Sequence, residues 1–129
     1  MTQASTLWTE ADLIHVYTTE QAVGDGQLID AQLGDLAEVT RQHVGGCPVF
    51  LTLHLYSTIK KAVENKRHCN DWKGVWHDVL WMSFVRVRPL TEGARKFRVT
   101  ITGVGRRRIF QLLVVADGSG LTFMHPQDY

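Results

Sequence analysis

The sequence is poor in cysteine and has no long apolar run, and both absences narrow the class of protein. Two cysteines, Cys47 and Cys69, are too few for a disulfide scaffold, so we expect free thiols. No apolar stretch approaches the roughly 18 to 20 residues that cross a bilayer. The opening MTQASTLWTEADL lacks the cationic and apolar regions of a secretory signal. We therefore expect a cytoplasmic protein that does not enter a membrane.

Motifs for cofactors and for catalysis are absent as well. The chain has no P-loop, dinucleotide-binding fingerprint, zincin motif or nucleophile elbow. Five His and Cys residues in the middle of the chain have side chains that can bind a metal ion: His43, Cys47, His54, His68 and Cys69. Their spacing matches no zinc-binding pattern. We therefore expect neither a cofactor nor a metal.

Positive charge is missing from the first 40 residues, which contain seven acidic residues and no Lys or Arg. Residues 86–108 have the opposite balance, with eight Lys or Arg and a single acidic residue, Glu92. The net charge of +1 conceals this segregation. A cation-rich segment of this kind can bind phosphates or an acidic partner, or it can pair with the acidic half of its own chain.

The length of 129 residues and the absence of linkers or repeats are typical of one domain. We expect residues 1–10 to be a flexible start and residues 11–129 to form a single α+β domain. Apolar periodicity and terminating glycines predict helical segments near 18–24, 35–44, 53–66 and 72–84. Short extended pieces are expected at 13–17 and 27–30.

The last third of the chain alternates apolar and polar residues as strands do. KFRVTIT, residues 96–102, predicts a half-buried strand, and residues 106–116 and 121–125 predict two more, with glycine-containing turns between them. The predicted fold class is therefore α+β, with a helical amino-terminal half packed on a carboxy-terminal antiparallel β-meander of about three strands.

Three of the four tryptophans lie in DWKGVWHDVLWMSFVRVRP, residues 71–89. On a helix, Trp72 and Trp76 share one face with other apolar residues, which we interpret as core. His77 and Trp81, four residues apart, share a second face. That face is either covered by the amino-terminal segment or exposed as an aromatic patch for a partner. Consecutive helical side chains diverge, so adjacency alone does not make His77 and Asp78 a catalytic pair.

Two stretches, IHVYTTEQAVGDGQLID (14–30) and HDVLWM (77–82), resemble an uncharacterised family of small proteins carried by bacteria, phages and plasmids. The first matches an entry motif of the form YTxxQAxxDGxLxD at Tyr17, Thr18, Gln21, Ala22, Asp25, Gly26, Leu28 and Asp30. The second is similar to a WDVLWM-like helix, although His77 stands where Trp is common. The closing MHPQD is similar to the family's end. The resemblance implies a setting on mobile elements, where small accessory proteins bind host or element components.

The entry motif also has an architectural interpretation. Thr18 can cap a helical turn, and Gly26 can adopt the positive φ that ends it. The same residues could instead form a binding loop, for which Tyr17, Gln21 and Asp25 are the candidates.

Three functional hypotheses follow. The first is a non-enzymatic interaction protein of a mobile element that docks on a macromolecular partner through a surface containing Trp81 or the Arg-rich sheet. The second is nucleic-acid binding through Arg98, on the outward side of the first strand, and Arg106, Arg107 and Arg108, at the start of the next. The third is a small enzyme using His77, Asp78 or Tyr17. A homodimer through a sheet edge is open under each hypothesis.

Overall fold

A computed structural model describes residues 27–85, 88–91 and 93–129. Within these residues one mixed sheet has the strand order β1-β2-β6-β5-β4-β3. The strands are β1 (Leu28–Asp30), β2 (Val49–Thr52), β3 (Arg88–Thr91), β4 (Ala94–Val104), β5 (Arg107–Asp117) and β6 (Gly120–Met124). The helices are α3 (Ala37–Val44), α4 (Leu53–Glu64) and α5 (Trp72–Val85), with short 3-10 turns η1 (Gly34–Leu36) and η2 (Pro126–Asp128).

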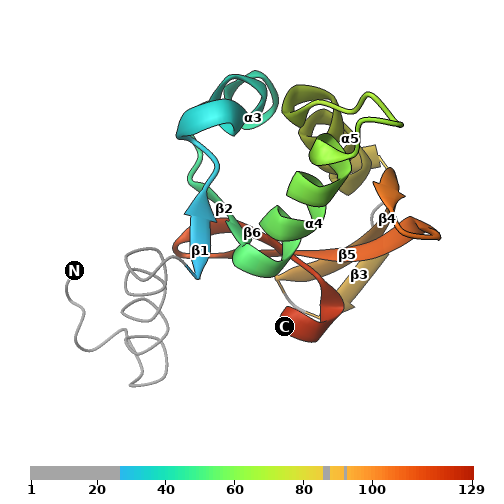
Figure 1. Ribbon diagram of the computed structural model, residues 1–129. Helices are drawn as coiled ribbons and strands as arrows, with labels where there is room; N and C mark the ends of the chain where they lie inside the picture. The colour runs from blue at the N-terminus through green and yellow to red at the C-terminus, as the bar shows by residue number, and fades with distance from the viewer. Residues whose placement is uncertain (1–26, 86–87, 92) are drawn as a thin grey trace, which may run out of the picture.

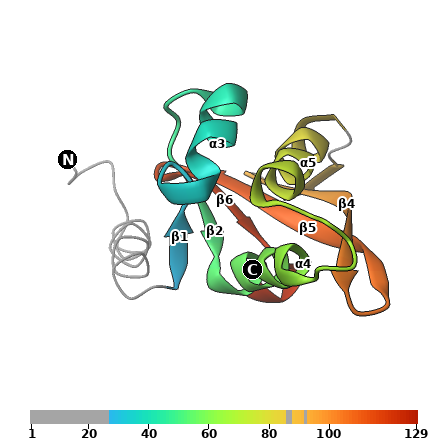
Figure 2. The same ribbon diagram turned by 45° about the horizontal axis from the view of Figure 1, so that its top comes forward.

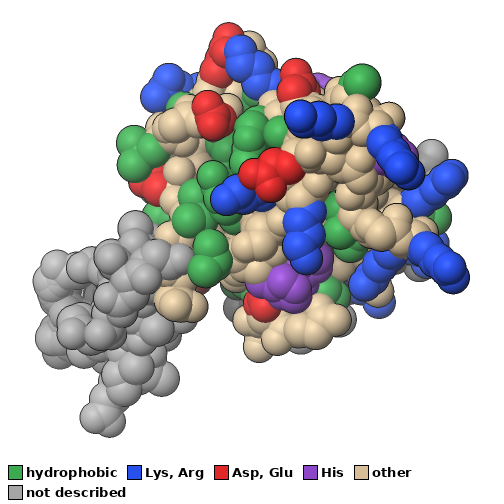
Figure 3. Space-filling view, in the orientation of Figure 1, with side chains coloured by type: hydrophobic (Ala, Val, Ile, Leu, Met, Phe, Trp, Pro, Cys, Tyr) green, Lys and Arg blue, Asp and Glu red, His purple; other side chains and the backbone are tan. Residues whose placement is uncertain are grey.

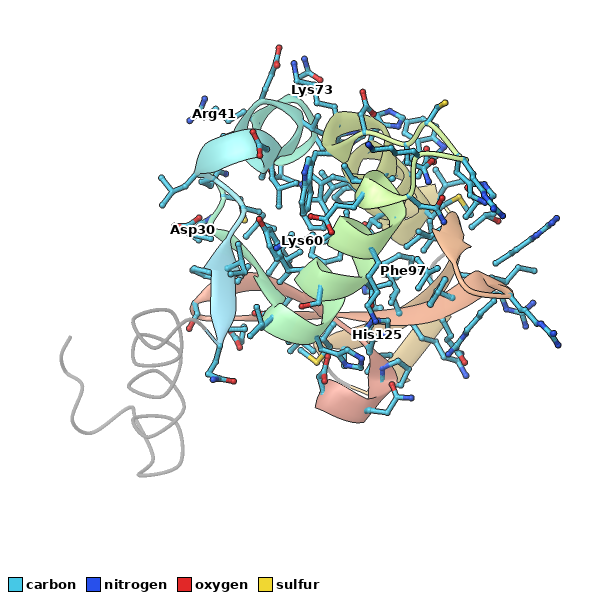
Figure 4. All side chains as sticks on the ribbon, in the orientation of Figure 1. Asp30, Arg41, Lys60, Lys73, Phe97 and His125 are labelled. Carbon is cyan, nitrogen blue, oxygen red and sulfur yellow. The ribbon has the colours of Figure 1, made fainter. Side chains whose placement is uncertain are left out.

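The three helices lie on the same side of the sheet, which gives a two-layer arrangement (Figures 1 and 2). The hydrophobic core fills the space between the layers, and α4 and α5 both pack on β4. Phe97, for example, points from β4 toward α4 (Figure 4). No helix among the described residues has both the length and the apolar character needed to span a bilayer.

The predicted α+β class is confirmed, but the sheet is larger than the meander of about three strands. The meander exists as β4-β5-β6, with antiparallel neighbours. The piece expected to be extended at 27–30 contains β1, Leu28–Asp30, which pairs with β2. Two further strands were not predicted: β2, which runs parallel to β6, and β3, which pairs with β4. The amino-terminal half therefore contributes strands as well as helices.

The helices begin and end near the predicted residues. Thr52 caps α4, because its hydroxyl oxygen accepts the backbone N–H of Leu55 at 3.2 Å. Gly45 ends α3 with a φ of 63°, a conformation that favours glycine. The segments expected at 1–10, 13–17 and 18–24 lie outside the described residues.

Candidate nucleic-acid interface

The β4–β5 hairpin ends in three consecutive arginines, as the sequence predicts. Arg106 lies in the turn, Arg107 and Arg108 begin β5, and all three are exposed. The guanidinium of Arg107 lies 4.8 Å from the centre of the Phe110 ring, a cation–π contact on a buried side chain. One of the three cations therefore lies over an aromatic ring of the core.

A second cationic segment lies against this hairpin, and sequence reasoning did not find it. Residues 65–71 connect α4 to α5 and carry exposed Lys66 and Arg67. The Asn65 side-chain amide donates to the backbone oxygen of Gly103 at 3.1 Å. Asn70 Nδ2 donates to the backbone oxygens of Ala62, at 3.2 Å, and Thr102, at 2.8 Å. Two asparagines thus fasten this loop to the hairpin.

Gly103 makes this close approach possible. Its φ is 92°, and a Cβ placed there would lie 3.3 Å from the Asn65 Cβ and 3.4 Å from the Ala62 oxygen. The pairing of β4 with β5 shifts register between Thr100 and Val104, so the glycine lies in an irregular stretch of the hairpin. The loop of residues 65–71 is therefore attached to the hairpin at this irregular stretch of β4.

Together these segments form what we call the basic end: Lys66, Arg67, Arg106, Arg107 and Arg108. Figure 3 shows Lys and Arg side chains gathered on the side of the molecule formed by the hairpin. Within the described part of the chain, none of the five pairs with a carboxylate, and the recorded ion pairs are Lys73–Glu38, His54–Asp128 and His77–Asp78. Most of the acidic segment, residues 1–26, lies outside the described residues.

Arg98 is exposed on the sheet face opposite the helices, where Gln111 is its cross-strand partner. Its position on the outward side of the first predicted strand is confirmed. It lies several residues along β4 from the hairpin turn and is not part of the basic end.

The predicted second face of α5 is exposed. Trp81 is 52% accessible, whereas Trp76 is fully buried and Trp72 is half-buried against Tyr56. His77 and Trp81 stack with ring centres 6.2 Å apart, which confirms their contact. His43 of α3 meets the His77 ring edge-on at 5.0 Å, and burial, followed by repulsion from His77, lowers its pKa.

The expectation that His77 and Asp78 diverge is wrong in one respect. Their side chains turn toward each other, with Nδ1 and Oδ1 3.5 Å apart. Both side chains are more than half exposed, so the contact is a weak surface pair. Tyr17, Gln21 and Asp25, the other candidates, lie outside the described residues.

A histidine–carboxylate network at the carboxy-terminal turn was also missed. His54 Nδ1 lies 3.0 Å from Asp128 Oδ1, and the Thr52 hydroxyl donates to the other carboxylate oxygen at 2.8 Å. The backbone N–H of His125 adds a bond of 3.2 Å to the same oxygen. These bonds tie η2 to the start of α4 and hold the His54 ring with Nδ1 toward the carboxylate.

His125 lies beside α4 (Figure 4), and the centre of its ring is 4.1 Å from that of His54. Its Nε2 is 2.8 Å from the Thr58 hydroxyl, which donates its proton to the His54 carbonyl, so the ring nitrogen is the donor. Burial, with repulsion from His54 and Arg107, lowers the pKa of His125 to about 4. Burial opposes ionisation of Asp128, yet hydrogen bonds from Thr52 and His54 outweigh it and lower the pKa.

The residues weighed for metal binding are not gathered into one site. His43 lies on α3, His54 on α4, and Cys69 on the loop after α4. In the described ranges, no group of three or more His, Cys, Asp or Glu residues is placed to hold a metal ion. Both cysteines are free thiols.

Comparisons of the chain with protein-family models, curated proteins and solved structures find no match.

Proposed function

We propose that the protein is a non-enzymatic interaction protein that binds nucleic acid through its basic end. The observation that carries the proposal is the attachment of the cationic loop to the hairpin by Asn65 and Asn70. This attachment holds two separate cationic segments together at the turn end of the β4–β5 hairpin. Cations that have no carboxylate partner among the described residues, gathered at one end of two strands, suit the repeating phosphates of a nucleic-acid backbone.

Duplex is the favoured form. Single-strand binders add exposed aromatic side chains on which bases stack, whereas the ring that contacts the basic end within the described residues is that of Phe110, which is buried beneath Arg107. Phosphate contact from a β-hairpin positions a protein on a duplex without reading its sequence. The setting on a phage or plasmid, implied by the resemblance of the entry motif and the α5 stretch, belongs to the same proposal.

The test is a fluorescence-anisotropy titration of the full chain against labelled duplex DNA over a range of salt. If all five cations contact phosphates, affinity should fall ~500-fold between about 50 and 200 mM salt. The triple substitution Arg106→Ala, Arg107→Ala, Arg108→Ala should lower the affinity and reduce the log–log salt slope by about 3.

The matched control removes three positive charges elsewhere, by Arg41→Ala, Lys60→Ala and Lys73→Ala. All three are exposed residues of the helix layer, and Figure 4 shows them away from the hairpin. This variant should keep most of the salt slope. Equal losses in the two triple variants would mean that net charge alone drives binding, and absence of binding at low salt would reject the proposal.

A further inference from the structure

The solvent side of α5 carries large apolar side chains where a surface helix normally has polar ones. His77, Trp81 and Phe84, at positions i, i+4 and i+7, lie on one face, opposite the buried face of the helix. We call these three residues the α5 stripe. Trp81 is 52% exposed and Phe84 53% exposed. Contiguous exposed aromatic side chains of this kind mark interaction sites more often than a lone exposed residue does.

The stripe leads into a cavity of about 180 Å³ at the carboxy-terminal end of the helix. Phe84 lines it from α5, while Val114, Leu121 and Phe123 line it from the sheet. A cavity of roughly 150 Å³ holds a benzene-sized group. This one therefore has room for a single bulky side chain, the anchor that hot spots at protein interfaces use.

The charge beside the cavity indicates which kind of partner segment would bring a bulky side chain into it. Arg95 is exposed and also lines the cavity, and no Asp or Glu of the described residues lines it. Within the described residues Arg95 pairs with no carboxylate. A segment that fills the cavity therefore meets a free guanidinium at the rim, which favours an acidic neighbour beside the apolar anchor.

From these observations we infer that the α5 stripe and its cavity form a docking surface for a protein partner. The partner presents an acidic segment with a bulky apolar side chain, which enters the cavity while Trp81 packs against the segment. This surface uses none of the five residues of the basic end, so it would allow the protein to hold a nucleic acid and an acidic protein segment at once.

The test uses a phage-displayed library of random 12-residue peptides selected on the immobilised full chain. We expect enriched sequences to combine Asp or Glu with Phe, Trp, Leu or Ile. A synthetic peptide of an enriched sequence should bind at least tenfold more weakly to Trp81→Ser and to Arg95→Glu. Selection on Arg95→Glu should instead enrich Lys or Arg beside the apolar anchor.

Two matched controls lie elsewhere on the surface. Ile109→Ser removes an apolar side chain that is 60% exposed on β5, and Arg98→Glu reverses a charge on the opposite face of the sheet. Both should bind the peptide as the unmodified chain does. Circular dichroism and thermal melting check that every variant is folded.

Three results would overturn the inference. The first is that no peptide is enriched, or that the enriched peptides lack acidic residues or bind Arg95→Glu unchanged. The second is that Trp81→Ser converts a dimer to a monomer in light scattering, which would make the stripe a contact between two copies. The third is that Trp81→Ser weakens duplex DNA binding as much as peptide binding, which would assign the stripe to the nucleic-acid interface.

Discussion

Trp76 donates its indole N–H to the hydroxyl oxygen of Thr40, with 2.9 Å between Nε1 and Oγ1. Both side chains are fully buried. The Thr40 hydroxyl in turn donates a hydrogen bond to the carbonyl oxygen of Leu36 at 2.8 Å. The indole N–H and the hydroxyl therefore both have a hydrogen-bond partner. The bond between Trp76 and Thr40 joins α3 to α5. Because of it, the tryptophan is buried entirely and its N–H is still paired.

Thr40→Val should destabilise the fold, because it keeps the shape of the side chain and removes the acceptor for the indole. An unpaired buried donor costs about 1–3 kcal/mol. In a Trp76→Phe background the same substitution should cost less, since no indole N–H remains. Urea unfolding of the four chains of this double-mutant cycle measures the coupling. Additivity within about 0.3 kcal/mol would show that the bond contributes nothing to stability.

Replacement of Trp76 by Ala should lower the free energy of unfolding much more than replacement of Trp81 by Ala. Trp76 has no accessible surface, and loss of a buried tryptophan costs about 3–5 kcal/mol. Trp81 is half exposed, so its replacement should change the free energy of unfolding by less than about 0.5 kcal/mol. Urea denaturation measures both changes. A large loss with Trp81→Ala would mean that this side chain is needed for folding and not for docking.

Local periodicity was enough to place most of the structure. The spacing of apolar residues in α5 assigned Trp76 to the core and Trp81 to another face, and the alternation in β4 assigned Arg98 to the outward side. These patterns depend only on helix and strand geometry, which neighbouring residues determine. Where the second face of α5 lies, in the interior or in solvent, depends on what packs against it, so the sequence left both outcomes open.

Apart from β3, which pairs with the next strand in the chain, the features that were missed are non-local. The four residues of β2 run directly into α4 at Thr52, so no turn separates them, and their partner β6 lies some 70 residues away. The basic end also depends on a contact between distant residues that the sequence does not indicate. The arginines of the hairpin were evident, but nothing in the composition of the 65–71 loop indicates that Asn65 and Asn70 fasten it to Thr102 and Gly103.

Stability should fall between about pH 6.5 and pH 4 because of His125. Its pKa is lowered from 6.5 to about 4, chiefly by burial. In this range the unfolded chain binds a proton that the folded chain does not, so the free energy of unfolding decreases as the pH falls. Asp128, whose pKa is lowered from 3.8, adds its loss only at lower pH.

His125→Gln should reduce this pH dependence, and His43→Gln should reduce it further, because the pKa of His43 is also lowered. Urea midpoints at several pH values from 7.5 to 4.5 measure the slope, and an NMR titration of the His125 ring should give a midpoint near 4. An unchanged slope in His125→Gln would mean that this histidine is not the group responsible.

Gly103→Ala should weaken duplex binding without removing any charge. The added Cβ would lie 3.3 Å from the Asn65 side chain, and the residue has a φ of 92°. The close contact and the strained φ both disfavour the native packing of the loop on the hairpin, so we expect Lys66 and Arg67 to be displaced from the three arginines. Asn70→Ala should act in the same direction, because the backbone oxygens of Ala62 and Thr102 lose a shared donor.

The salt slope distinguishes this effect from a general loss of stability. With two of five cations displaced, the log–log slope for duplex DNA should fall by about 2, although the net charge is unchanged. Gly34→Ala is the matched control, since Gly34 also has a positive φ, 67°, but is the first residue of η1 and has open space around its Cβ position. It should destabilise the chain and leave the slope as it was. A slope unaltered by Gly103→Ala would show that the loop takes no part in binding, and the interface would then consist of the hairpin arginines alone.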